Sequence, residues 1–124
     1  MESLERAVAR AAQGELDARE GEAALRFQLD ADFPGFQGHF PDHPVLPAFV
    51  QVLMGRHLLQ QWFGESRKLL EVDRARFRLP IGPGELRVRC KQLDAGHLVQ
   101  LETDQGQAAS FLLFTEPAAT EGTA

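Results

Sequence analysis

The stretch that decides the fold is PAFVQVLMGRHLLQQWF, residues 47–63, which is apolar on nearly every side. Ten of the sixteen residues from 48 to 63 are apolar, and they spread around the helix instead of forming one stripe. A helix of this kind in a soluble protein is buried. Pro47 suits the first helical position, because its missing N–H would be unpaired there, and Gly64 is placed to end the helix. We therefore predict a buried helix over residues 47–63.

Strand patterns with a period of two lie on both sides of this helix. Before it, AALRFQLDA at residues 23–31 alternates apolar and polar side chains, which indicates a strand with one buried face. After it, strands are predicted at residues 69–80, 86–93, 98–104 and 107–116. The turns between these four are GPGE, DAGH and the segment around Gln105–Gly106. Short links favour antiparallel neighbours, so we predict four strands in hairpin order.

The remaining segments complete one α+β domain over residues 1–116. Residues 1–13 suit a helix that Ser3 can cap, and GELDAREGE at residues 14–22 reads as a polar connection. The core is expected over residues 23–115, and the tail at 117–124 is expected to be disordered. An antiparallel sheet wrapped around the long central helix would bury that helix. Such a sheet leaves uncovered edges, so we expect a dimer.

Composition excludes several classes of protein. The 124 residues fit one domain, and Cys90 is the single cysteine, which fits a reducing compartment. The chain contains no apolar run of about 18 residues and no signal-peptide pattern, so we expect a cytoplasmic protein with no membrane partner. The net charge of −5 argues against nucleic acid as the main partner.

Positive charge is concentrated in residues 67–91. This segment holds eight of the thirteen basic residues and three acidic ones. One interpretation is the solvent-facing side of ordinary strands. The other is a docking surface for an acidic partner, which long-range attraction would steer. The candidate docking residues are Arg74, Arg76, Arg78, Arg87 and Arg89.

The stretch GHFPDHPVLP, residues 38–47, contains two histidines among three regularly spaced prolines. Three fixed φ angles exceed what a simple turn needs, which favours a histidine held in place for chemistry. A packing role for His39 is the alternative. His39 and His43 are four residues apart, but the prolines between and after them forbid a helix, so no metal site is predicted.

The chain resembles the hotdog-fold 3-hydroxyacyl-acyl-carrier-protein dehydratases of the FabZ and FabA type. Their signature is G-H-F-P-x-x-P-V-x-P, then a helix, then a strand ending R-F-x-x-P-x-x-P-G. The matching residues are Gly38, His39, Phe40, Pro41, Pro44, Val45, Pro47, Arg76, Phe77, Pro80, Pro83 and Gly84. The resemblance covers roughly residues 23 to 115, and VLPAFVQ at residues 45–51 is also similar to an aryl-polyene branch.

The resemblance implies a substrate, a mechanism and partners. The substrate would be a 3-hydroxyacyl thioester of acyl carrier protein, with His39 removing the α-proton. The backbone N–H of Ala48, where the family usually has Gly, would bind the thioester carbonyl. The residues assigned to substrate binding are Gly38, Phe40, Pro47, Gln51 and Leu53. No cofactor and no metal is expected, and the second partner would be an identical or different hotdog subunit.

The acid that completes this chemistry is missing. The family places Glu or Asp six residues after the last proline of the motif, and that position holds Leu53. The helix from 47 to 63 contains no Asp or Glu at all. His57, one turn later on the same face, would serve either as a substitute acid or as a hydrogen-bonded histidine at a dimer interface. Gln51 could bind a substrate oxygen, but an amide is no acid at neutral pH.

Three functions therefore stay open. The first is a dehydratase-like enzyme, or a relative that uses His39 alone to isomerise an enoyl thioester. The second is a non-catalytic hotdog subunit that binds acyl carrier protein or completes a heterodimer in which the partner supplies the acid. The third is a thioesterase, because hotdog sheets host that chemistry as well. The fold alone does not decide among them.

Overall fold

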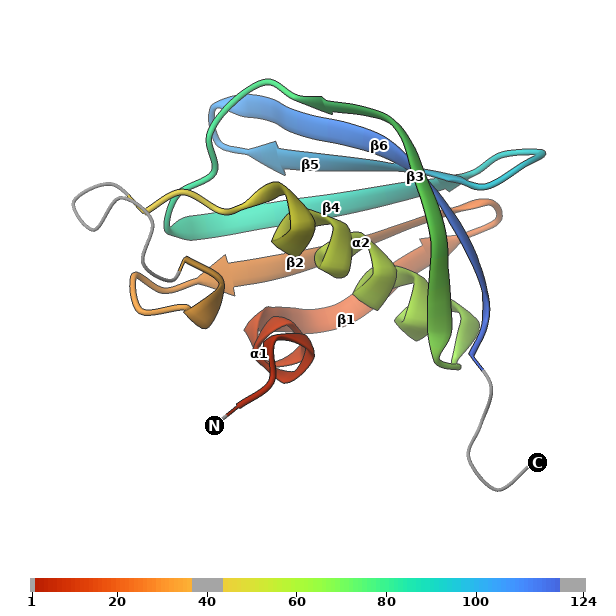
Figure 1. Ribbon diagram of the computed structural model, residues 1–124, viewed down its shortest axis with the longest axis horizontal. Coiled ribbons are helices and arrows are strands. Elements are labelled where there is room, and N and C mark those ends of the chain that lie inside the picture. The colour runs from red at the N-terminus through yellow and green to blue at the C-terminus, as the bar shows by residue number, and fades with distance from the viewer. Residues whose placement is uncertain (1, 37–43, 119–124) are drawn as a thin grey trace.

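The computed structural model describes residues 2–36 and 44–118. Its six strands form one antiparallel sheet in the order β1-β2-β4-β5-β6-β3, and helix α2 lies against one face of it (Figure 1). In chain order the elements are α1 (Leu4–Ala11), β1 (Ala12–Arg19), β2 (Glu22–Leu29), η1 (Pro34–Phe36), α2 (Ala48–Phe63), β3 (Arg67–Phe77), β4 (Gly84–Gln92), β5 (His97–Thr103) and β6 (Gly106–Pro117). The predicted α+β hotdog architecture, a sheet wrapped around a long helix, is confirmed.

Helix α2 is the centre of the core, as its sequence predicts. Val50, Met54 and Leu58 have no exposed surface. Gly55 lets the helix approach the sheet closely, because a Cβ there would lie 3.1 Å from both Leu113 and Val99. Gly64 ends the helix in the left-handed conformation, with φ 68°. The predicted start is wrong by one residue, since Pro47 is extended and stands as the N-cap.

The N-terminal segment differs from its prediction. Ser3 caps α1 by accepting a hydrogen bond from the Arg6 N–H, but the helix ends at Ala11. The chain then continues directly into β1, where the sequence indicates a helix end and a polar connection. β1 is an edge strand whose residues are mostly exposed. β1 is a strand because its backbone pairs with β2. Since this pairing needs few apolar side chains, the sequence of β1 gives little indication of a strand.

The predicted hairpin order is correct for three of the four strands after α2. β4 pairs with β5 and β5 with β6, as expected. β3 does not pair with β4, which lies between β2 and β5; β3 pairs with β6 at the far edge of the sheet. Residues 78–83 connect the two strands. The prolines at 80 and 83 in this connection cannot donate to a strand ladder, which suits a crossing and not a tight hairpin.

β3 and the residues after it are an exposed edge. Every residue from 70 to 80 is exposed, including Phe77 at 44%. Residues opposite each other on neighbouring strands lie on the same face. Val72 lies opposite Leu113 and Phe77 opposite Ala109, so both face the side of the sheet that holds α2. The alternation in this segment predicts a strand with one buried face. That face stays largely uncovered by the residues that the structure describes.

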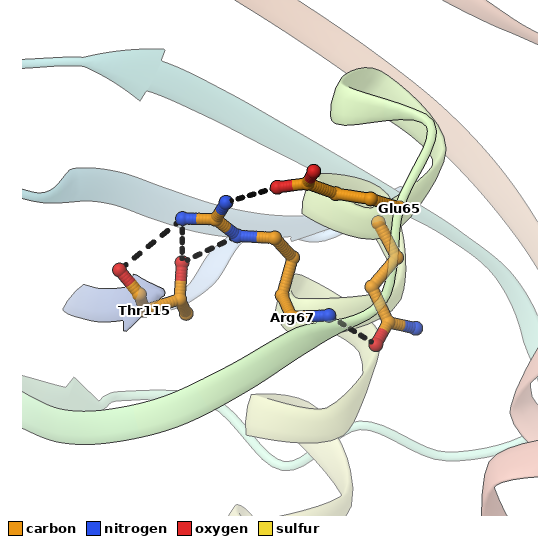
Figure 2. A network of polar contacts seen from close by, with 4 residues as sticks. Glu65, Arg67 and Thr115 are labelled. Atoms are coloured by element: carbon orange, nitrogen blue, oxygen red, sulfur yellow. Dashed lines mark hydrogen bonds and ion pairs between the residues drawn. The ribbon is translucent and has the colours of Figure 1, made fainter. Parts of the chain in front are cut away.

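Arg67 anchors the beginning of this edge strand. Figure 2 shows its guanidinium bonded to the hydroxyl and carbonyl oxygens of Thr115 on β6 and to the Glu65 carboxylate. The backbone N–H of Arg67 also donates to the Gln60 side chain on α2. These bonds tie the last turn of α2 to β3 and β6.

At the other end of the chain, β6 runs to Pro117, one residue into the predicted tail, and residues 119–124 lie outside the described residues.

Candidate functional site at the start of the central helix

Two buried contacts position the chain where it enters α2. The backbone N–H of Leu46 donates to the Ile81 carbonyl at 2.8 Å. The Gln51 side-chain amide donates to the Leu46 carbonyl at 3.1 Å. Gln51 is 4% exposed, so this bond forms inside the protein. Gln51 therefore fixes the chain before the helix, and its predicted role in substrate binding stays a prediction. Its Oε1 is buried with no partner among the described residues.

Ile81 is a part of the site that sequence reasoning missed. It is 1% exposed and belongs to the connection between β3 and β4. Its carbonyl holds Leu46, so the position of the α2 start depends on a segment 35 residues further along the chain. The one available signal was a single apolar residue within the proline- and glycine-rich segment PIGPG, residues 80–84. No local pattern links that residue to Leu46.

The first turn of α2 leaves backbone donors available. Val50 and Gln51 donate their N–H groups to the Pro47 carbonyl. Within residues 2–36 and 44–118, no side chain caps the helix, and Ala48 is exposed. Helix N-termini carry partial positive charge, which stabilises negative charge that develops on an oxygen. The N–H predicted to bind the thioester carbonyl therefore lies at an exposed and uncapped helix start. His39, Gly38 and Phe40 lie outside the described residues.

One side of α2 is less covered than the others. Residues three or four positions apart along it are half-buried or exposed, and we call them the open stripe: Phe49, Leu53, Arg56, Gln60 and Phe63. Leu53, the position of the missing acid, lies within this stripe and contacts the core with part of its side chain. α2 carries no carboxylate. Within residues 2–36 and 44–118, no group of three or more His, Cys, Asp or Glu side chains could hold a metal.

His57 faces the N-terminal elements. Its ring meets the Phe27 ring edge-on, with 6.2 Å between centroids, and it lines a pocket with residues of α1 and β1 that include Glu15. Burial lowers the pKa of His57, and the nearby Arg56 charge lowers it further. A histidine that favours its neutral form is a poor proton donor at neutral pH. The surroundings of His57 therefore support a packing role better than the role of substitute acid.

The structure separates the predicted basic docking residues into two groups. Arg74 and Arg76 lie on β3 at one edge, with Arg78 just beyond it. Arg87 and Arg89 lie on β4, and β5 and β6 stand between the two strands. Arg89 is also bonded to Glu102 on β5 at 3.1 Å. Arg76 and Arg89 point to the same outer face of the sheet through Ser110 and Gln100, but two strands separate them, so the five residues form two groups and not one cluster.

The sheet, the central helix and its uncapped start define a hotdog-fold protein. Among solved structures, the dehydratase heterocomplex ApeI:P from Xenorhabdus doucetiae has a TM-score of 0.73, and the match covers 84% of this chain and 95% of that one. Its sequence identity of 21% supports the shared fold alone. Residues 15–111 match the ApeI-like family, described as ApeI dehydratase. The chain belongs to this family.

Curated relatives are dehydratases as well. The 3-hydroxyacyl-[acyl-carrier-protein] dehydratase FabZ of a Caulobacter species is 39% identical over 62 residues, which is 43% of this chain and 38% of the relative. The FabZ of Thermus thermophilus is 43% identical over 60 residues, 42% of each chain. The matched part thus spans about two fifths of these relatives. No helix in the described part of the chain is long and apolar enough to cross a membrane.

Proposed function

We propose that this chain is a subunit of a dehydratase for 3-hydroxyacyl thioesters of acyl carrier protein, in which a second hotdog subunit supplies the acid. The observation that carries the proposal is the contrast within α2. The start of the helix is held by two buried bonds and leaves its backbone donors available, while the acid position is Leu53. Membership of a dehydratase family supports the reaction class.

In the proposed reaction, the His39 imidazole takes the proton from the α-carbon. Negative charge develops on the thioester oxygen, where the Ala48 N–H stabilises it. The electron pair then forms the α,β double bond as the bond from the β-carbon to the hydroxyl oxygen breaks. The hydroxyl must gain a proton to leave as water. Leu53 cannot deliver that proton, and no other α2 residue carries a carboxylate.

Two uncovered surfaces support a second subunit. The open stripe of α2 exposes Phe49 at 62%, and β3 leaves Val72 and Phe77 exposed on the same side of the sheet. A strand at a sheet edge offers backbone groups for pairing, and exposed apolar surface marks interfaces. The similar structure from Xenorhabdus doucetiae is described as a dehydratase heterocomplex. A different hotdog subunit that carries the acid would complete the site.

A non-catalytic subunit is the second candidate, and Leu53 is the observation that favours it. Such a subunit would bind acyl carrier protein or stabilise an active partner without taking part in the reaction. A thioesterase would need a carboxylate to activate water, and α2 offers none.

The test is dehydration of 3-hydroxyacyl carrier-protein thioesters of several chain lengths by the purified chain and its variants. We expect little turnover by the wild type alone. Leu53→Glu should raise turnover by about 10²–10⁴-fold, the usual contribution of a positioned proton donor. Leu53→Gln is the matched control, since it is polar but delivers no proton, and His39→Ala should remove the gain.

Each outcome has a separate meaning. If Leu53→Glu gains no more than Leu53→Gln at concentrations where both variants are dimeric, the assignment of the acid position is wrong. If His39→Ala leaves the gain intact, His39 is not the base. If the wild type alone turns over rapidly, no partner is needed to supply the acid.

A further inference from the structure

Arg56 is a charged residue in the middle of the open stripe, and it has no counterion among the described residues. It lies one turn beyond Leu53 and is half-buried. Its Nε atom is buried and has no hydrogen-bond partner among the described residues. The ion pairs within this part of the chain join Arg10 to Glu2, Arg67 to Glu65 and Arg89 to Glu102, and none includes Arg56.

A subunit that covers the open stripe would remove Arg56 from water. The desolvation of one unpaired charge costs several kcal/mol in proteins. The same surface is otherwise apolar or neutral, because its other members are Phe49, Leu53, Gln60 and Phe63. Any stable partner on this face must therefore bring a group that matches the guanidinium. A carboxylate matches it best, because its two oxygens can accept two parallel hydrogen bonds from the planar guanidinium.

In a second copy of this chain, α2 and β3 supply no such carboxylate on the side of the open stripe. α2 contains no Asp or Glu, so the same helix from another copy brings none. On β3, Glu71 lies opposite Phe114 and Asp73 opposite Leu112, which places both acids on the sheet face away from α2. Glu65, two residues after the end of α2, is already bonded to Arg67 at 2.6 Å. Self-association that brings the α2 helices or the β3 edges of two copies together would therefore leave Arg56 unmatched by these acids.

We propose that Arg56 selects a different hotdog subunit, one that presents a carboxylate to the open stripe from the matching face of its central helix. This inference rests on the proposed function and names the chemistry of the partner. The carboxylate that binds Arg56 is distinct from the proton donor. A neighbouring guanidinium favours the ionised form of a carboxyl group, and an ionised group has no proton to deliver to the leaving hydroxyl. The partner helix therefore carries two acidic side chains.

The first test measures self-association by analytical ultracentrifugation at several protein concentrations. Arg56→Met keeps the length of the side chain and removes its charge. We expect it to lower the dissociation constant of the homodimer at least tenfold relative to the wild type. Arg26→Met is the matched control, because Arg26 is exposed on β2 and has the same charge change away from α2. A tight wild-type dimer that Arg56→Met weakens or leaves unchanged would overturn the proposal, as would two equally weak associations.

The second test supplies the missing carboxylate. Arg56→Glu presents an acid from the same stripe, and native mass spectrometry can separate its mixed dimer with the wild type from either homodimer. We expect the mixed dimer to dominate an equimolar mixture, and less so at high salt. A statistical mixture of dimers would contradict the requirement for a carboxylate. Neither readout involves turnover. A gain of activity in Leu53→Glu with no effect at Arg56 would therefore reject this inference and leave the proposed function standing.

Discussion

Replacement of Arg67 by methionine should destabilise the fold by about 2–3 kcal/mol. The guanidinium donates three hydrogen bonds to Thr115 at 3.1–3.2 Å and one to Glu65 at 2.6 Å. It also lies 4.6 Å from the centre of the Phe63 ring. The side chain is 12% exposed, so solvent weakens these contacts less than at an open surface. Figure 2 shows the bonds to Thr115 and Glu65, and these bonds and the Phe63 contact are all lost in Arg67→Met.

The magnitude follows from adding and discounting these terms. Hydrogen bonds to a charged group contribute about 1.5–3 kcal/mol each, but two of the three share one Thr115 oxygen. The cation–π contact adds about 0.5–1 kcal/mol. The Glu65 pair adds less than about 1 kcal/mol, because that carboxylate is 45% exposed. Two costs oppose these contributions. Fixing the arginine side chain loses rotamer entropy worth roughly 2 kcal/mol, and the guanidinium must also be desolvated.

Urea unfolding at pH 7 measures this change, with Arg26→Met as the exposed control that should stay within about 0.5 kcal/mol of the wild type. Arg67→Lys should recover less than half of the loss, because an ammonium cannot reproduce the planar fork. Burial lowers the pKa of His97 and the Arg67 charge lowers it further, so an NMR titration should show that pKa rise in Arg67→Met. A loss of stability below about 0.5 kcal/mol, or full recovery by lysine, would refute the reasoning.

Three further predictions follow from the same structure. Gly55→Ala should lower the free energy of unfolding in urea by about 1–3 kcal/mol, because the new Cβ would lie 3.1–3.3 Å from three core side chains. An unchanged urea midpoint would contradict the close contact of α2 with the sheet. Burial lowers the pKa of His57 and of His97 from 6.5, so the unfolded chain binds more protons than the folded protein. The melting temperature should therefore be highest above pH 6.5 and fall as the pH drops below it. A melting temperature that stays constant from pH 7.5 to 5.5 would show that neither histidine is desolvated. Arg76→Glu with Arg78→Glu should weaken binding of acyl carrier protein at low salt if β3 is a docking edge, and unchanged binding would exclude that role.

The sequence by itself determined the elements whose stability is local. The apolar run of α2 lies between a proline and a left-handed glycine, so its limits follow from backbone geometry. The alternation of Leu86, Val88 and Cys90 placed the buried face of β4 correctly. The proline-rich motif and the strand motif after the helix together indicated the family, which the match over residues 15–111 confirms.

Only the tertiary structure decided how distant segments meet. β1 carries too few apolar residues to indicate a strand, and its pairing with β2 makes it one. The pattern of β3 indicates a strand but not its neighbour, which is β6 and not β4. His97 begins β5 directly after a hairpin turn, yet its ring packs against the Trp62 and Phe63 rings. Periodicity reports which side of an element is apolar, whereas the choice of partner depends on the packing of residues far apart in the chain.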